Sequence, residues 1–378
     1  MIESNTRVGT ETGIKVTCSR DDFAQKLAVV ARAVSTRASV QILSGVLLRA
    51  EAGRLHLAAT DMELSLRSSF EAQVADEGAT VVPGRLLVDL VRLLPASDVI
   101  VEQRPEEGVI HITSGSSTAS LNTYAAEDFP RLPDLDAVGT FTVPRETLLE
   151  TVARVLRSAS RDESRPVLTG ILVRFEGGSL VMAATDSYRL SVKETPVSGE
   201  VPDLEAIIPA RALTELGRIA QSGDTVELGV HENQVVFAAD DVWLTTRRID
   251  GQFPNYRQLL PETFEHEVTL PRAEFLDVVR RVGVLVQRTS PIQLRFAEGE
   301  LRVLARTQDV GEAQETLPVA FTGEPMEIGF NAEFLREGIE SVSADDLRLR
   351  LISPLRPAVI DGGPDDPTYL IMPIRLPG

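Results

Sequence analysis

The sequence contains one cysteine, few aromatic residues and no long hydrophobic run. Because Cys18 is alone in 378 residues, an intrachain disulfide and a metal site built from several thiolates are excluded. Hydrophobic residues make up 43% of the chain but aromatic residues only 5%, so its cores must be mainly aliphatic. No apolar run approaches the ~20 residues that span a bilayer, and the polar start from Met1 to Gly13 lacks the apolar centre of a signal peptide. We therefore predict a soluble, cytoplasmic protein.

The usual signatures of catalysis are also missing. The four histidines show no paired spacing typical of metal ligands; they are His56, His111, His231 and His266. The sequence contains neither a Gly-x-x-x-x-Gly-Lys-Ser/Thr phosphate loop nor a Gly-x-Ser-x-Gly nucleophile elbow. We expect no metal, no cofactor and no ATP hydrolysis, and we predict that the protein is not an enzyme.

Positive charge is in short supply. The chain has 38 Lys and Arg against 56 Asp and Glu, a net charge of −18. Nucleic-acid-binding proteins usually show a basic footprint, so the total charge argues against that class. Acidity can also simply keep an abundant protein in solution. The distribution of the basic residues must therefore decide between these interpretations.

A long pattern occurs twice, 125 residues apart. The first copy runs from Ser39 to Leu66 and the second from Ser164 to Val192. Each predicts two strands joined by a glycine turn and closed by the tetrapeptide Ala-Ala-Thr-Asp. A repeat of this length, held in register, indicates a duplicated structural unit. The copies differ after the tetrapeptide, where Met62-Glu63-Leu64-Ser65 is replaced by Ser187-Tyr188-Arg189-Leu190.

Three modules of similar length can be traced along the chain. Each begins with a short strand and a helix, continues with strand hairpins, and contains a second helix. Asp21, Pro144 and Pro271 suit the starts of the first helices, and the second helices are predicted after Pro83-Gly84, Pro209 and Asn331. The combination predicts an α+β fold, and the repeat is too long for a solenoid or propeller. The predicted bounds are a tail at 1–12 and domains at 13–135, 139–262 and 266–378.

The predicted helices carry arginine on their polar faces. In the second module, Leu148, Val152 and Val155 form an apolar stripe, and Arg154 and Arg157 lie opposite. An arginine on a solvated face is ordinary for one helix, and acidic residues share these faces. Six equivalent helices with the same bias in an acidic chain are less ordinary. If all six faced one surface, that surface would attract phosphate.

Three stretches resemble a known family. They are Ala183 to Leu190, Phe253 to Tyr256 and Tyr369 to Leu376. With the threefold module, they are similar to the bacterial DNA polymerase III beta subunit, the replicative sliding clamp. The resemblance covers Ile14 to Leu376, and the terminal Pro377-Gly378 is similar to actinobacterial members.

The resemblance implies a DNA clamp fold and a head-to-tail homodimer whose six modules form a closed ring. Helices would line the hole, sheets would form the outside, and duplex DNA would pass through as a topological, sequence-independent partner. Weak, salt-dependent phosphate contacts suit a ring that must slide. A separate clamp loader would be needed, and the protein would act at replication forks in the nucleoid. The arginines expected to face DNA are Arg32, Arg85, Arg92, Arg154, Arg157, Arg161, Arg211, Arg218, Arg280, Arg281, Arg288 and Arg336.

The resemblance also implies a pocket between the second and third domains. It would bind short peptides of the polymerase III alpha subunit, the clamp loader, other polymerases and repair proteins. Met372 would help the groove adapt to varied peptides, and Arg189 and Arg375 could orient a peptide backbone or carboxylate. Gln258 stands where some members have arginine, and Pro357 replaces a small hydroxyl residue. The expected pocket residues are Leu168, Thr185, Ser187, Tyr188, Arg189, Leu190, Pro254, Gln258, Leu259, Asn331, Phe334, Leu355, Met372, Pro373, Ile374 and Arg375.

The subunit junction is the third site that the resemblance implies. The strand containing Ala119 and Leu121 would meet the helix end near Val284 and Leu285 of the partner copy. Val284 and Leu285 lie off the apolar stripe of their helix, so we predict exposed apolar side chains that need a partner. Ala119 is small where the family can have an aromatic residue.

Three alternatives remain open from the sequence. One is a duplicate clamp that protects its host from a clamp-binding antibiotic. Another is a metal-dependent nucleic-acid hydrolase that uses Asp61 and Asp186, although each aspartate is better explained as capping its own turn. The last is an acidic repeat scaffold without DNA contact.

Overall fold

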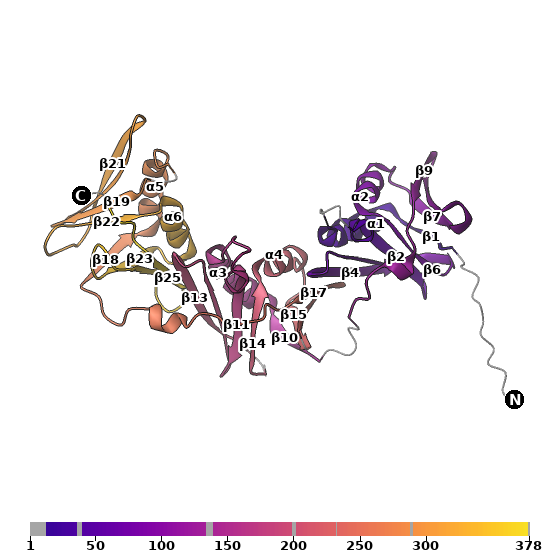
Figure 1. Ribbon diagram of the computed structural model, residues 1–378, viewed down its shortest axis with the longest axis horizontal. Helices are drawn as coiled ribbons and strands as arrows, with labels where there is room; N and C mark the ends of the chain where they lie inside the picture. Colours follow the sequence, from indigo (N-terminus) through magenta and orange to yellow (C-terminus); the bar gives the residue numbers. More distant parts are fainter. Residues whose placement is uncertain are drawn as a thin grey trace. The chain divides into compact units, whose positions relative to one another are not determined.

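The computed structural model describes residues 13–35, 40–133, 139–198, 202–231, 233–287 and 290–376 (Figure 1). The chain divides into two compact units. Unit 1 comprises Met1–Thr142 and Glu215–Arg247, and unit 2 comprises Val143–Thr214 and Arg248–Gly378. The division passes through the predicted second module, so the three-domain bounds stay a prediction. The predicted tail at 1–12 lies outside the described residues, as does Arg288.

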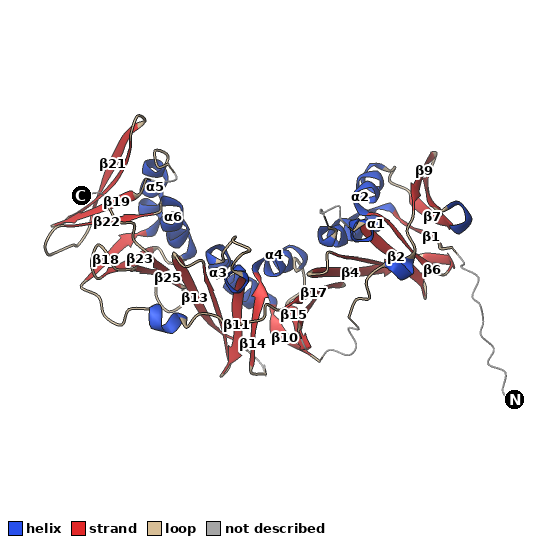
Figure 2. Ribbon diagram, viewed as in Figure 1, coloured by secondary structure: helices blue, strands red, loops and turns tan. Residues whose placement is uncertain are grey.

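Unit 1 is built on two antiparallel sheets. One has the strand order β5-β1-β7-β8-β9, and the other has the order β10-β15-β16-β17-β4-β3-β2-β6. Two helices, α1 (Arg20–Val30) and α2 (Gly84–Leu93), pack against each other (Figure 2). The strands are β1 (Lys15–Ser19), β2 (Gly45–Glu51), β3 (Arg54–Thr60), β4 (Leu64–Glu71), β5 (Gln73–Asp76), β6 (Gly78–Pro83), β7 (Asp98–Arg104), β8 (Val109–Ser114), β9 (Ser117–Asn122), β10 (Thr140–Pro144), β15 (Thr225–His231), β16 (Gln234–Ala239) and β17 (Val242–Arg247).

Unit 2 also has two antiparallel sheets. Their strand orders are β14-β11-β12-β13-β25-β24-β23-β18 and β21-β20-β19-β22. The helices are α3 (Arg145–Val155), α5 (Arg272–Gly283) and α6 (Ala332–Ser341), while α4 (Ala210–Ile219), like the end of β10, crosses the boundary between the units. The strands are β11 (Gly170–Glu176), β12 (Ser179–Thr185), β13 (Arg189–Pro196), β14 (Leu204–Pro209), β18 (His266–Pro271), β19 (Ile292–Ala297), β20 (Glu300–Thr307), β21 (Gly311–Pro318), β22 (Met326–Phe330), β23 (Asp346–Leu351), β24 (Ala358–Asp361) and β25 (Thr368–Ile371).

The repeated stretch forms the same three strands in both units. Every bound of β2, β3 and β4 recurs 125 positions later in β11, β12 and β13. The turn between the first two strands has positive φ at Ala52 and Gly53 in unit 1, and at Gly177 and Gly178 in unit 2. Glycine adopts this conformation without steric cost, which explains the glycine at each turn. The predicted duplication is therefore confirmed strand by strand.

The helices begin close to the predicted positions. Pro144 and Pro271 are the residues immediately before α3 and α5. The start of α1 differs from the prediction at Asp21. Its N-cap is Ser19, whose hydroxyl accepts a hydrogen bond from the Asp22 N–H at 3.4 Å. Asp21 instead lies in the first turn, where a negative charge interacts favourably with the helix dipole and stabilises the helix. A short 3₁₀ segment continues α1 and α3, a common way for a helix to end.

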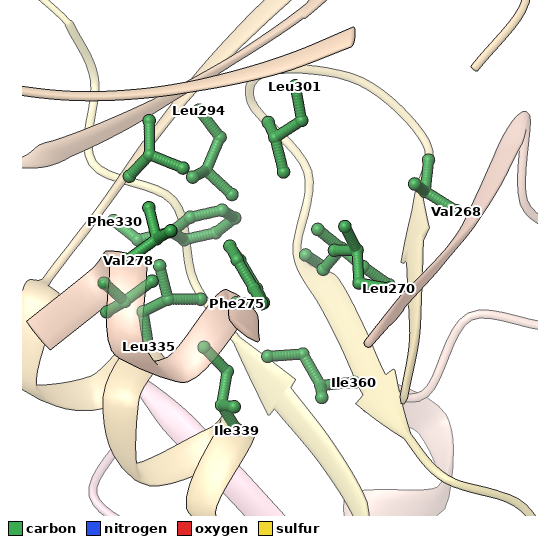
Figure 3. Close-up of a cluster of buried hydrophobic side chains, with 14 of the residues drawn as sticks. Val268, Leu270, Phe275, Val278, Leu294, Leu301, Phe330, Leu335, Ile339 and Ile360 are labelled. Atoms are coloured by element: carbon green, nitrogen blue, oxygen red, sulfur yellow. The ribbon is translucent and has the colours of Figure 1, made fainter. Parts of the chain in front are cut away.

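The largest described core of unit 2 lies between α5, α6 and the strands around them (Figure 3). Phe275 of α5 and Leu335 and Ile339 of α6 point into it and are fully buried. They meet Leu294 and Phe330 from β19 and β22. Each fully buried side chain of this size contributes about 1.5–3 kcal/mol relative to exposure. This packing holds α5 and α6 side by side, which matters for the arginines that they carry.

Two features are absent from the described part of the chain. None of its helices is both long enough and apolar enough to cross a membrane. Its His, Cys, Asp and Glu side chains form no group of three or more that could hold a metal ion.

Candidate peptide, DNA and subunit interfaces

The turn from Thr185 to Arg189 is held by its own side chains. The Thr185 hydroxyl donates to the Arg189 carbonyl at 2.6 Å. One Asp186 carboxylate oxygen accepts from the N–H groups of Tyr188 and Arg189 at 2.9 and 3.1 Å. Ser187 takes a positive φ of 80°, and Tyr188 projects into solvent. The prediction that Asp186 caps its own turn is confirmed.

This turn lies beside the C-terminal segment of the chain. β13 pairs with β25, with Arg189 opposite Ile371. Beyond the paired strands, the Met372 N–H donates to the Tyr188 carbonyl at 2.9 Å. The Ile374 N–H then donates to the Gly329 carbonyl at 2.8 Å. Segments nearly two hundred residues apart in sequence therefore meet at the predicted peptide pocket, and both belong to unit 2.

A buried apolar cluster supports this region. Leu190 of β13 and Leu370 of β25 pack with Phe253 and with Tyr256, the first residue of the 3₁₀ turn η7 (Tyr256–Leu259). Several apolar side chains in or next to these elements are exposed. Such a group is unusual on the surface of a soluble protein unless the surface binds a partner. The exposed fractions are 62% for Tyr188, 51% for Leu259, 41% for Met372 and 38% for Ile374. Leu355, in the loop between β23 and β24, is 61% exposed.

Arg189 does not have the role that we predicted. Its side chain is only 8% exposed, and its Nε lies 3.1 Å from Asp186 Oδ2. Nη1 pairs with Glu337 of α6, and Nη2 donates to the Arg157 carbonyl. The guanidinium stacks 4.1 Å from the centre of the Phe334 ring. With these donors occupied inside the fold, Arg189 joins β13 to α6 and is not available to orient a peptide. Arg375 remains exposed.

Several other predicted pocket residues support the rim from beneath. The Asn331 side chain caps α6 by accepting from the N–H groups of Glu333 and Phe334 at 2.9 and 3.1 Å. Burial raises the pKa of Tyr369, which stays a neutral donor to the Phe334 carbonyl at 2.8 Å. Thr185 and Leu190 are buried. Ser187 and Gln258 are exposed, and the half-buried remainder are Leu168, Pro254 and Pro373.

The predicted DNA-facing arginines of unit 2 are mostly ion-paired. Arg157, Arg280 and Arg336 lie near one carboxylate, Glu340. Arg281 makes a two-point contact with Glu315 of β21, at 2.8 and 2.7 Å. Arg154 is more enclosed than its polar-face position suggested, with 18% of its side chain exposed. Arg161 is exposed beyond the 3₁₀ segment that follows α3.

In unit 1, Arg85 and Arg92 are exposed on α2. Arg32 lies 3.6 Å from Glu215, which also pairs with Arg218 on α4. Arg211 is exposed on α4, in the part of that helix belonging to unit 2. The predicted bias of arginine toward exposed helix faces therefore holds for α2 and α4, and Glu215 partly neutralises it on α4.

The predicted junction residues lie at two surfaces. Ala119 and Leu121 are half-buried in β9, the last strand of its sheet in the described residues. Val284 is 80% exposed, as predicted. The prediction of an exposed side chain was wrong for Leu285, which is half-buried against the core of unit 2.

Sequence reasoning missed two exposed apolar side chains on α2. Leu86 is 58% exposed and Leu93 is 80% exposed, both off the buried stripe of Leu87 and Val91. An apolar residue at an off-stripe helix position was the available signal. The same signal was read correctly at Val284.

Comparison with known proteins agrees with this architecture. Residues 14–133, 142–255 and 257–375 match the N-terminal, central and C-terminal domains of the DNA polymerase III beta subunit. The beta sliding clamp of Streptomyces coelicolor is 34% identical, covering 97% of this chain and 100% of the relative. That of Synechococcus elongatus is 36% identical over 96% and 100%. The beta sliding clamp homolog GriR of Streptomyces muensis is 31% identical over 94% and 98%.

Solved structures give the same result. A Caulobacter crescentus sliding clamp superposes with a TM-score of 0.90 at 30% identity, covering 96% of this chain and 100% of that one. A Bartonella birtlesii clamp bound to griselimycin gives 0.89 at 30% identity over the same shares. A Bacillus subtilis clamp, at 24% identity, shares the fold with a TM-score of 0.92, covering 97% and 100%.

An α+β chain that carries three related domains of this kind is a DNA clamp subunit. The chain belongs to the bacterial DNA polymerase III beta subunit family, and its function is that of a sliding clamp in DNA replication.

Proposed function

We propose that two copies of this chain join head to tail into a ring that encircles duplex DNA and catalyses no reaction. Each subunit would contribute three domains, at 13–135, 139–262 and 266–378. The ring would act in the cytoplasm at replication forks. Its partners would be the polymerase III alpha subunit, the clamp loader, and other polymerases and repair proteins.

One observation carries the peptide-binding part of this proposal. Tyr188, Met372 and Leu259 are exposed around a buried apolar floor, beside the hydrogen bond that joins the turn to the C-terminal segment. An extended peptide with two or three apolar anchors could cover these side chains. Such a small interface would exchange readily, as a tether shared by several partners requires.

The subunit junction rests on apolar exposure at two surfaces. Leu86 and Leu93 are exposed on α2, and β9 ends its sheet in unit 1. Val284 is exposed at the end of α5 in unit 2. An edge strand and isolated apolar side chains favour association, and a head-to-tail pair would bury both surfaces.

The peptide site is tested by removing Met372 to Gly378 and measuring the affinity of a fluorescent peptide from a polymerase C-terminus. We expect binding to be lost while light scattering still gives twice 41.1 kDa. Removing Pro377-Gly378 alone is the matched control and should leave affinity unchanged. Unchanged peptide affinity in the longer deletion would refute the pocket assignment.

Topological DNA binding needs a separate test. After loading by a clamp loader, the wild-type protein should stay on closed circular DNA and leave the same DNA once it is linearised. Equal retention on both forms would refute the ring. A monomer whose mass does not change with concentration would also contradict it.

A duplicate clamp that confers antibiotic resistance is the second candidate. The similarity to the GriR homolog of Streptomyces muensis favours keeping it, although the identity to the Streptomyces coelicolor clamp is higher. Deleting this gene alone separates the two. Loss of viability supports the replicative clamp, and normal growth with increased antibiotic sensitivity supports the duplicate.

A further inference from the structure

Glu340 of α6 lies among arginines from three separate elements of unit 2. Its Oε1 is 2.8 Å from Arg280 Nη2 of α5 and 4.0 Å from Arg336 Nε, one turn earlier on α6. Its Oε2 accepts a hydrogen bond from Arg157, in the 3₁₀ segment that follows α3. One carboxylate therefore accepts hydrogen bonds from two of the guanidinium groups that are expected to meet DNA and lies near a third.

The surroundings form a recess between α3 and α6. A cavity of about 270 Å³ is lined by Arg154, Arg157, Glu340 and Ser341, among others. Arg154 Nη1 donates to the Ser341 carbonyl at 2.8 Å. Arg154 also pairs with Glu150 at 3.2 Å, and Arg280 lies 3.9 Å from Asp277. Four arginine side chains thus lie close to three carboxylates, which neutralise most of their positive charge.

Glu340 presents to these arginines the same chemistry as a DNA phosphate. Both are anions that accept charge-assisted hydrogen bonds from guanidinium groups. Burial opposes ionisation of Glu340, but hydrogen bonds from Arg280 and Arg157 hold its pKa below the ordinary value. Glu340 is therefore charged at neutral pH. It is 20% exposed, whereas Arg157 and Arg280 are more than half exposed and can reach an external anion.

We propose that Glu340 is a built-in competitor of the DNA backbone, holding Arg157 and Arg280 so that duplex phosphate must displace it. This inference rests on the proposed passage of DNA along these helices and deepens it. A phosphate contact that must first break an internal ion pair is weakened, and a ring held by topology gains mobility from weak contacts. Glu340 would thus set how strongly the helices grip DNA.

The direct test is E340Q, which keeps the side-chain shape and removes the charge. Binding of the unloaded dimer to a fluorescent DNA duplex is measured by anisotropy over a salt series. We expect affinity about 10-fold higher at 50 mM salt, and a log–log salt slope steeper by about 1 to 2, because each neutralised phosphate contributes about −0.9. E205Q is the matched control. Glu205 pairs with Arg174 across β11 and β14, and both variants remove one carboxylate from an arginine pair.

Two outcomes would overturn the proposal. One is an E340Q affinity and salt slope equal to those of E205Q, with thermal unfolding confirming that both are folded. The other comes from R157Q in the otherwise unchanged protein. Because Glu340 already occupies Arg157, R157Q should weaken DNA binding less than 2-fold alone but reverse most of the gain in E340Q. A loss of 10-fold or more in R157Q alone would show that Arg157 is free to bind DNA.

These results are distinguishable from a failure of the clamp function itself. If the wild-type protein stays on circular DNA and E340Q matches E205Q, only the role of Glu340 is wrong. If the wild-type protein leaves circular and linear DNA equally, the proposed ring is wrong whatever E340Q does.

Discussion

The two copies of the Ala-Ala-Thr-Asp turn have the same backbone and different surroundings. In unit 1, Thr60 donates to the Leu64 carbonyl at 3.1 Å, as Thr185 does to the Arg189 carbonyl in unit 2. Asp61 accepts from the N–H groups two and three residues later at 3.1 and 2.9 Å. The residue after each aspartate has nearly the same positive φ, 78° and 80°. The duplicated turn is therefore a structural element, which confirms the capping role predicted for both aspartates.

The neighbouring strand also joins each turn in the same way. The Arg247 N–H donates to the Glu63 carbonyl at 3.2 Å, and the Met372 N–H donates to the Tyr188 carbonyl at 2.9 Å. The side chains at these positions differ in polarity, since Glu63 and Arg247 are charged where Tyr188 and Met372 are apolar. In unit 1 the adjoining cavity is only about 60 Å³ and is lined partly by Arg131 and Pro133. One backbone arrangement thus gives a polar surface in one copy and an apolar one in the other.

The largest expected effect comes from replacing Arg189 of unit 2 by leucine, the residue at the equivalent position 64 of unit 1. Arg189→Leu leaves Glu337 buried without its partner, and breaking such a pair costs about 3–5 kcal/mol. Urea unfolding should show this loss of stability. In R189L/E337L both partners are apolar, so most of the stability should return. A single variant as stable as the wild type would mean that the Arg189 pair does not stabilise unit 2.

Exchanging the exposed apolar residues of the proposed peptide site sharpens the comparison next. Tyr188→Glu with Met372→Arg places the side chains of the first copy on the second. We expect affinity for a polymerase-derived peptide to fall about 30- to 100-fold, because losing central apolar anchors typically costs 2 kcal/mol or more. The reverse exchange, Glu63→Tyr with Arg247→Met, is the control and should not change peptide affinity. Equal losses in both would show that the effect is not local to the pocket.

The two capping aspartates should differ by a smaller amount. Each alanine variant removes an acceptor for two backbone N–H groups, and Asp186→Ala also removes the carboxylate beside Arg189. We expect Asp186→Ala to be more destabilising than Asp61→Ala by about 1.5 kcal/mol, the lower end of the usual range for a hydrogen bond to a charged group. The measurement is equilibrium unfolding of both variants under the same conditions. Equal losses would mean that the Asp186–Arg189 contact stabilises the protein no more than the further contacts of Asp61 do.

The smallest expected effect concerns the residues with positive φ. Glycine relieves the left-handed conformation, so Met62→Gly should stabilise the protein by about 0.5–1 kcal/mol. Ser187→Gly should gain slightly less, because the Ser187 hydroxyl accepts a hydrogen bond from Arg165 at 3.1 Å. Differential scanning calorimetry would detect both changes. A larger gain at Ser187 would contradict this account of the two turns.

Local chemistry explains what could be predicted from the sequence. The strands of the repeat, the glycine turns and the aspartate caps depend on residues within a few positions of one another. The apolar off-stripe position of Val284 likewise followed from helical periodicity. The same reasoning failed for Leu285, because the helix ends at Gly283 and Leu285, beyond the C-cap Val284, packs against the core.

The amino-acid sequence by itself determined the duplicated strands, the capped turn and the change from Glu63 to Tyr188 that makes one copy apolar. Only the tertiary structure decided that Arg189 is buried against Glu337 and that Glu340 gathers Arg157 and Arg280. The reason is sequence separation. Glu337 lies 148 positions after Arg189, and Glu340 lies 183 positions after Arg157. Periodicity can place each of these side chains on a face, but it carries no information about which distant face packs against it.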